Sequence, residues 1–284
     1  MLDLKFLLKI SRPRFWIYIF GPFIVGLISG ANSPNEILSL KNLIFGIYFL
    51  FPANLLIYGI NDIFDYETDK LNQKKTEYET LVEPDYRKGL SIVILLTNLP
   101  FIIYSFFINS KLALAMCGFL FFSCFYSAPP IRAKAIPFLD SIFNILYVFP
   151  AIFSFVLMTE NFPPILAVVS AGFWTMAMHA YSAVPDIEAD KQANLQTVAT
   201  KLGANGTLLF CLVCYLLSAV LAFQFIGIFA FFFGIIYAAM MIISFKFNQK
   251  NEVFKVYKFF PMVNTIVGFF LFWTIALSKF DILK

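Results

Sequence analysis

The chain has 284 residues, of which 60% are hydrophobic, 19% aromatic and only 13% charged, with a formal net charge of +4. An ordinary soluble domain carries about a quarter charged residues, and 38 phenylalanines would leave large apolar patches in contact with water. This composition excludes the soluble globular class. It also predicts no nucleic-acid partner, because the small positive excess is divided among short loops. Membrane lipid is therefore expected to surround most of the chain.

Nine apolar segments approach the length of about 20 residues that a helix needs to cross a bilayer. They lie at 14–31, 39–60, 90–108, 112–128, 138–157, 163–184, 207–224, 226–245 and 259–278. No polar connection is long enough for a separate soluble domain. We therefore expect a single integral-membrane domain over 1–284, an all-α polytopic bundle of nine transmembrane helices. The bundle is expected to surround a central cavity that opens near the cytoplasmic face.

The distribution of lysine and arginine predicts the orientation, since these residues gather on the cytoplasmic side. With the N-terminus inside, the inner segments hold most of them. The outer side keeps only Lys41, Lys111, Lys279 and Lys284. The sequence thus predicts a protein of the cell (inner) membrane whose N-terminus and acid-rich loops are cytoplasmic.

Carboxylates are costly near a bilayer, so their positions are informative. One acidic cluster follows the second span, and another follows the sixth. Both contain the pattern Asp-x-Glu-x-Asp-Lys, at 65–70 and at 186–191. Because the copies are four spans apart, both lie on the same side of the membrane. This echo suggests two related halves that face one site.

Helical spacing places the acids of each cluster on one face. Asn61, Asp65 and Asp69 recur every fourth residue, as do Asp186 and Asp190. Neighbouring like charges destabilise a bare helix, so a cation is expected to offset them. Oxygen ligands without histidine or cysteine suit Mg²⁺, which binds through carboxylates together with substrate phosphates. A solvated acidic loop edge is the alternative interpretation.

Basic residues near both clusters could bind a diphosphate. Arg132 offers a planar fork that matches phosphate oxygens, whereas lysines act as point charges. Inner loops also carry such residues for topology alone. The basic residues expected at the diphosphate are Lys70, Lys74, Lys75, Lys191, Arg132 and Lys134. Asp62 is expected to reach the same cavity.

Acids for a metal, bases for phosphate and an aromatic-rich interior suit the ionisation of an allylic diphosphate. Negative charge then develops on the leaving pyrophosphate, where Mg²⁺ and basic side chains would stabilise it. The isoprenyl chain becomes a carbocation, which the rings of Tyr126 and Tyr181 could stabilise by cation–π attraction. Aromatic residues are so abundant here that some near any site are expected by chance.

At these residues the sequence resembles the UbiA superfamily of intramembrane prenyltransferases. Three family motifs, NDxxDxxxD, YSxPPxRxK and DxxxD, occur in order on the second, fourth and sixth spans. They are matched by Asn61, Asp62, Asp65, Asp69, Tyr126, Ser127, Pro129, Pro130, Arg132, Lys134, Asp186 and Asp190. The resemblance implies nine transmembrane helices and two Mg²⁺ ions, bridged by the diphosphate, among Asn61 and the aspartates at 65, 69, 186 and 190.

The segment 11–16 and the residues after the first motif are similar to the carotenoid-modifying branch of the superfamily, the lycopene elongases. That branch adds a five-carbon prenyl unit to a carotenoid chain end. The resemblance therefore implies isoprenoid and carotenoid biosynthesis, with a prenyl diphosphate donor and lycopene as the lipophilic acceptor. Gln73 departs from the proline expected there, and 196–201 follows the family loop only loosely. A quinone-precursor ring and a lipid headgroup remain alternative acceptors.

Other classes compete with this interpretation. Ion-coupled transporters also carry intramembrane carboxylates, but typically near the bilayer midplane. Membrane phosphatidyltransferases use aspartate-bound metals in a longer motif that does not follow Asp62. The single histidine, His179, is expected to be a packing residue, and Asp140 has no role in this interpretation.

Overall fold

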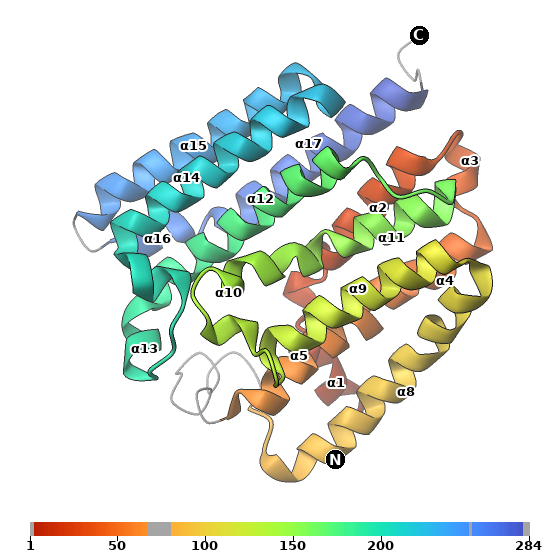
Figure 1. Cartoon of the computed structure of the whole chain (residues 1–284), viewed down its shortest axis with the longest axis horizontal. Helices are drawn as coiled ribbons and strands as arrows, with labels where there is room; N and C mark the ends of the chain where they lie inside the picture. Colours follow the sequence, from red (N-terminus) through yellow and green to blue (C-terminus); the bar gives the residue numbers. More distant parts are fainter. Residues whose placement is uncertain (1–2, 67–80, 250–251, 281–284) are drawn as a thin grey trace. The chain divides into compact units, whose positions relative to one another are not determined.

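The computed structural model describes residues 3–66, 81–249 and 252–280 (Figure 1). These residues form helices and turns, and the described ranges contain no strand. Nine helical segments in them are long and apolar enough to span a membrane. These segments are Pro13–Gly30, Leu40–Phe64, Pro84–Ile108, Ser110–Ser127, Leu139–Thr159, Ile165–Gln192, Val198–Ile226, Ile228–Asn248 and Val253–Phe280. The prediction of an all-α, nine-span protein is confirmed.

Contacts between residues divide the chain into two compact units. The first comprises 1–132 and 149–162, and the second comprises 133–148 and 163–284. The expected single domain, central cavity and cytoplasmic opening stay predictions.

The first unit contains a short N-terminal helix, four longer segments and the end of the fifth span. Its elements are α1 (Leu4–Ile10), η1 (Pro13–Phe15), α2 (Ile17–Gly30), α3 (Pro34–Ile37), α4 (Leu40–Leu50), α5 (Pro52–Phe64), α8 (Pro84–Ile108), α9 (Ser110–Ser127) and α11 (Phe149–Thr159). Prolines at 52 and 84 occupy the first helical position, where the missing N–H costs nothing. Helix α8 therefore begins six residues before the apolar segment that predicted it.

Aromatic rings form the core of the first unit. Phe45, Tyr48, Phe49, Phe119 and Phe153 are all completely buried. The ring centroids of Phe45 and Phe153 are 4.7 Å apart, and those of Phe49 and Phe153 are 5.2 Å apart, both edge to face. Such pairs add about 0.5–1.5 kcal/mol each beyond the burial of their area. Many of the phenylalanines are thus structural.

Helices α2 and α11 approach each other unusually closely. Gly26 of α2 lies against Ala151 and Ser154 of α11, and a Cβ added at Gly26 would be 2.8 Å from the Ala151 Cα. Gly30 repeats the contact one turn later, against Met158. Small residues at such crossings let backbones pack together in the absence of a hydrophobic driving force between helices.

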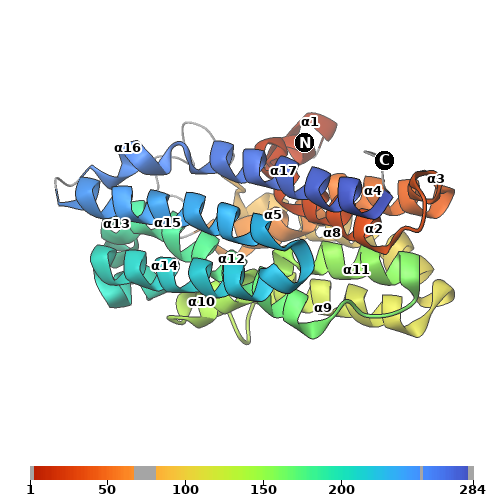
Figure 2. The ribbon, with the colours of Figure 1, turned by 90° about the horizontal axis from the view of Figure 1, so that it is seen from above.

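The second unit contains the end of the polar turn after the fourth span, from Ala133 on, the start of the fifth span and the last four spans. Its elements are η2 (Ala133–Ala135), α10 (Leu139–Ile142), η3 (Phe143–Tyr147), α12 (Ile165–Ala183), η4 (Val184–Asp186), α13 (Ile187–Gln192), α14 (Val198–Ile226), α15 (Ile228–Asn248), α16 (Val253–Tyr257) and α17 (Phe260–Phe280). Helices α12, α14 and α15 run side by side (Figures 1 and 2).

The segment after the second acidic cluster differs from the loop that the sequence suggested. Helix α14 begins at Val198, nine residues before the predicted span. The side chains and backbones of Thr197 and Thr200 bond reciprocally as a capping box, which starts the helix there. Gly203, with φ +67° and ψ 171°, then interrupts it. The capping residues are visible in the sequence, but segment 196–201 is polar and is therefore predicted to be a loop.

Candidate active site

The first aspartate motif lies at the C-terminal end of α5. Asp62 and Asp65 are 3% and 2% exposed, and Asn61 is half-buried. The helix ends at Phe64, and Asp65 is its C-cap. The Asp65 N–H still donates to the Asn61 backbone oxygen at 3.0 Å, so these two residues keep helical spacing. Four predicted site residues, Asp69, Lys70, Lys74 and Lys75, lie outside the described residues.

The first motif contacts the polar turn after α9, within the first unit. The Asn61 Nδ2 donates to the Ser127 Oγ at 3.0 Å. The Arg132 Nη2 is 3.7 Å from the Asp65 Oδ1. Arg132 has φ +46°, an uncommon conformation for a residue with a side chain. The motif after the second span and the motif after the fourth span thus meet. This agrees with the prediction that both lie on the same side of the membrane.

A second arginine at this site was missed by the sequence analysis. The Arg12 Nη2 donates to the Asp62 Oδ1 at 2.7 Å, and the guanidinium lies 4.8 Å from the centre of the Tyr58 ring. Their side chains are 14% and 2% exposed. The sequence analysis counted Arg12 among the inner basic residues and within segment 11–16, and gave it no contact at the site. The proline that follows it was a signal in the sequence, but an insufficient one. In the structure Arg12 has φ +51°.

Replacing Arg12 with alanine is expected to cost about 3–5 kcal/mol of stability, because the carboxylate of Asp62 stays buried after losing this cation. Thermal unfolding in detergent would measure the loss. The double variant Arg12→Met/Asp62→Leu is expected to recover part of it, since it removes both charges. Equal stability of wild type and Arg12→Ala would contradict a stabilising pair.

The second aspartate motif lies in the second unit, where the sixth span ends. Helix α12 gives way to the 3₁₀ turn η4 at Val184, and Asp186 is the N-cap of α13. Asp186 and Asp190 are both half-buried, so both reach solvent. Lys191 is exposed and its Nζ lies 3.4 Å from the Glu188 Oε1. Asp186 therefore ends the turn η4, and Asp190 lies four residues later within α13.

The remaining predicted residues have different surroundings. Tyr126 is half-buried near the end of α9, while Lys134 in η2 is 9% exposed. Tyr181 is completely buried, and its hydroxyl lies 2.8 Å from the Ser244 Oγ. Its ring packs edge to face on Phe260, with centroids 5.0 Å apart. Tyr181 is thus part of the packed interior of the second unit.

The donor set fits a hard divalent cation. Asn61, Asp62 and Asp65 present oxygen atoms at one helix end. Because the Asn61 Nδ2 donates to Ser127, its Oδ1 points elsewhere, and this oxygen has no hydrogen bond within the described ranges. The described residues do not gather three or more acid, histidine or cysteine side chains in one metal-binding group. They supply oxygen atoms, the ligand type that Mg²⁺ prefers, with two arginines beside them.

Comparisons with known proteins agree in family and fold. A model of the UbiA prenyltransferase family matches residues 19–275. A lycopene elongase/hydratase of Haloarcula japonica is 36% identical over 277 residues, covering 96% of this chain and 92% of the relative. One of Halobacterium salinarum is 37% identical over 272 residues, covering 93% and 94%.

Solved structures show the same architecture. A UbiA homologue from Archaeoglobus fulgidus, bound to GPP and Mg²⁺, superposes with a TM-score of 0.69. The alignment covers 95% of this chain and 99% of that one, at 22% identity. At this identity, the similarity establishes the fold.

Proposed function

We propose a specific reaction for this chain, which belongs to the UbiA prenyltransferase family and is a membrane-bound prenyltransferase. In this reaction, which depends on Mg²⁺, it transfers an isoprenyl group from an allylic prenyl diphosphate to a carotenoid such as lycopene and releases pyrophosphate. The match to the family model confirms the resemblance inferred from the three motifs. The single observation that carries the proposed chemistry is the contact of the Asn61–Asp65 helix end with Ser127 and Arg132.

The proposed roles rest on the matched motifs and, for the described residues, on their surroundings. Asn61, Asp65 and Asp69 in the first unit, and Asp186 and Asp190 in the second, are the proposed metal ligands. Bound Mg²⁺, in two ions by our proposal, supplies positive charge that stabilises the leaving pyrophosphate. Arg132 is beside Asp65 and sufficiently exposed to turn its fork toward phosphate oxygens. The remaining proposed contacts of the diphosphate are Asp62, Lys70, Lys74, Lys75, Lys134 and Lys191.

The reaction breaks the allylic C–O bond, and its electron pair leaves with the pyrophosphate. The terminal double bond of the carotenoid attacks the allylic carbon and forms a new C–C bond. The resulting cation loses a proton to regenerate a double bond. Tyr126 is proposed to stabilise the allylic cation through its ring. Tyr181, whose hydroxyl lies against Ser244, would act only through its ring.

The carotenoid acceptor is supported by the names of the relatives, several of which are lycopene elongases/hydratases. A quinone-precursor ring and a lipid headgroup are the alternatives within the same chemistry. An ion-coupled transporter is the alternative in another class, and membership of an enzyme family speaks against it. The protein is integral to the membrane. We place it in the cell (inner) membrane with its N-terminus and acidic loops in the cytoplasm, from its lysine and arginine distribution.

The test uses purified protein in detergent with Mg²⁺, a C5, C10 or C20 prenyl diphosphate, and either lycopene or a quinone-precursor ring. Wild type is expected to release pyrophosphate and elongate lycopene, and chelation by EDTA is expected to stop both. Asp186→Asn should lose at least about 100-fold in rate, since a charged ligand becomes neutral. Glu188→Gln, two residues away and 82% exposed, is the matched control and should retain the rate.

Each result distinguishes the proposals. Elongated lycopene supports the carotenoid acceptor. Prenylation of the ring alone would overturn that acceptor and keep the family chemistry. Turnover that persists in EDTA would overturn the metal assignment.

A further inference from the structure

Asp140 is a completely buried carboxylate in the second unit to which the proposed reaction gives no role. It lies in α10, two residues after Phe138, whose φ is +69°. Both of its oxygens accept backbone N–H groups. Oδ1 accepts from the Ser141 N at 2.8 Å, and Oδ2 accepts from the Val198 N at 2.8 Å. Each carboxylate oxygen of Asp140 therefore has a backbone N–H donor of its own.

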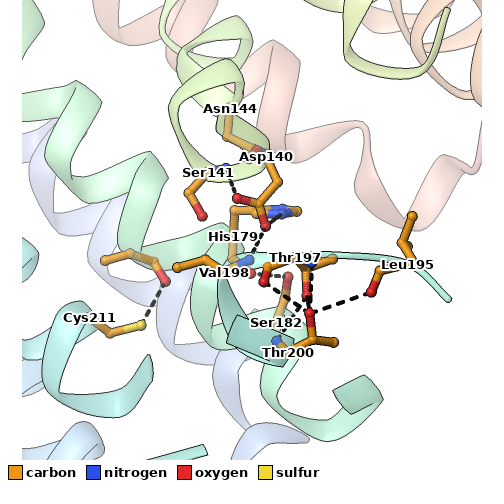
Figure 3. A network of polar contacts seen from close by, with 11 residues as sticks. Asp140, Ser141, Asn144, His179, Ser182, Leu195, Thr197, Val198, Thr200 and Cys211 are labelled. Carbon is orange, nitrogen blue, oxygen red and sulfur yellow. Dashed lines mark hydrogen bonds and ion pairs between the residues drawn. The ribbon is translucent and has the colours of Figure 1, made fainter. Parts of the chain in front are cut away.

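A cation-forming side chain lies beside this carboxylate. The His179 Nε2 is 3.7 Å from the Asp140 Oδ2, and the histidine is 16% exposed. The Asn144 Nδ2 donates to the Asp140 backbone oxygen at 2.6 Å, which fixes the turn that carries the carboxylate. Figure 3 shows Asp140 pointing from its short helix toward both His179 and Val198. The carboxylate thus joins three segments: α10, α12 and the start of α14.

The two partners of Asp140, His179 and Val198, flank the second aspartate motif in the sequence. His179 is on α12, one turn before the helix ends, and Val198 is the first residue of α14. Between them, 180–197 contains Asp186 and Asp190. Both ends of this segment are therefore held at a single oxygen of Asp140. Burying a carboxylate costs several kcal/mol unless charge and hydrogen bonds offset it, and an apolar residue of similar size would fill the space without that cost.

We propose that Asp140 is a positioning residue, which together with His179 fixes 180–197 and thereby sets where Asp186 and Asp190 present their carboxylates. It acts through the segment and does not touch the substrate. The structural part of the proposal is independent of the proposed function. The expected effect on Mg²⁺ rests on the proposed function.

The replacement Asp140→Asn keeps the shape but exchanges one acceptor oxygen for an N–H₂ group, which must face either Ser141 N–H or Val198 N–H. His179→Gln replaces the imidazole with a neutral amide, which weakens the other contact, and is the milder variant. Ser170→Ala is the matched control. It removes a 2.8 Å hydrogen bond from the Ser170 Oγ to the Ser218 oxygen between the same two helices, α12 and α14. Ser170 lies nine residues from His179, about 13 Å along the helix.

Two measurements test the proposal. Hydrogen–deuterium exchange of the full chain in detergent reports the segment directly, without turnover. Asp140→Asn is expected to speed exchange in 186–200 at least about 10-fold, with little change elsewhere in the second unit, and Ser170→Ala is expected to leave 186–200 unchanged. In pyrophosphate release, Asp140→Asn is expected to raise the half-saturating Mg²⁺ concentration about 10-fold, with kcat at saturating Mg²⁺ within about threefold of wild type.

Accelerated exchange confined to 186–200, together with the shift in Mg²⁺ dependence, would support the proposal. Unchanged exchange in 186–200, or exchange that rises equally throughout the unit, would overturn it. An unchanged Mg²⁺ dependence would overturn the link to the second motif. If Asp140→Asn does not fold, His179→Gln is judged by the same criteria. Wild type without any turnover would refute the proposed function, while the exchange experiment would still decide whether Asp140 holds the segment.

Discussion

Asp65→Asn is expected to lower the rate of pyrophosphate release by about 1,000-fold, a loss of about 4 kcal/mol of transition-state stabilisation. The carboxylate is 2% exposed and lies at the end of α5. Asparagine preserves its size but removes the charge that would hold a divalent cation. It also removes the attraction between this position and Arg132, whose Nη2 lies 3.7 Å away. The measurement is single-turnover release from a prenyl diphosphate at saturating Mg²⁺.

An exposed acid in the same unit provides the control for this substitution. Asp85 lies in the first turn of α8 and is exposed, so Asp85→Asn should change the rate less than about twofold. Asp65→Asn should also remain folded, with an unfolding temperature close to that of wild type. A variant that is folded and retains a tenth or more of the rate would exclude Asp65 as a metal ligand.

Gly26→Val is expected to prevent stable folding of the first unit. Its Cβ would overlap the Ser154 side chain and the Ala151 backbone oxygen of α11, and would lie 2.8 Å from the Ala151 Cα. Backbone atoms cannot turn aside as a flexible side chain does. The cost should therefore exceed the 1–3 kcal/mol, roughly, of an ordinary overpacked core. The expected result is loss of the monodisperse peak in detergent size-exclusion chromatography and a large fall in unfolding temperature.

Gly268→Val is the matched control, since a Cβ at this position of α17 would meet nothing within 4 Å. The same replacement in another membrane-spanning helix should leave folding intact. If both valine variants fold equally well, the close contact of α2 with α11 does not limit stability. If both fail, glycine itself, rather than the contact, is required.

The sequence predicted the spans well because lipid imposes a length and a polarity that can be counted. It also predicted that the first motif and the turn at Ser127 and Arg132 share one side, and the contacts in the first unit agree. Its helical spacing argument agrees with the structure from Asn61 to Asp65, whose N–H donates to the Asn61 backbone oxygen at 3.0 Å, and stays a prediction for Asp69. Periodicity describes an uninterrupted helix and contains no information about where capping ends it.

Long-range polar pairs were beyond the sequence analysis for a different reason. Arg12 and Asp62 lie 50 positions apart, and Asp140 and Val198 lie 58 apart. Neither pair has a local pattern, because its members meet only after several helices have packed. Asp140 had no interpretation in the sequence, and His179 was expected simply to pack. In the second unit both belong to one polar network.

The contact of Gly26 with α11 also constrains how the protein is made. Helix α2 belongs to the first span, whereas α11 completes the fifth. A ribosome delivers the first span to the bilayer well before its tightest neighbour exists. The glycine face of α2 must therefore remain in lipid, or against a provisional neighbour, while three more spans are inserted. A chain truncated after Arg132 would lack α11 and would leave that face uncovered. Assembly of the first unit is consequently completed late, by a segment that returns to it from the second.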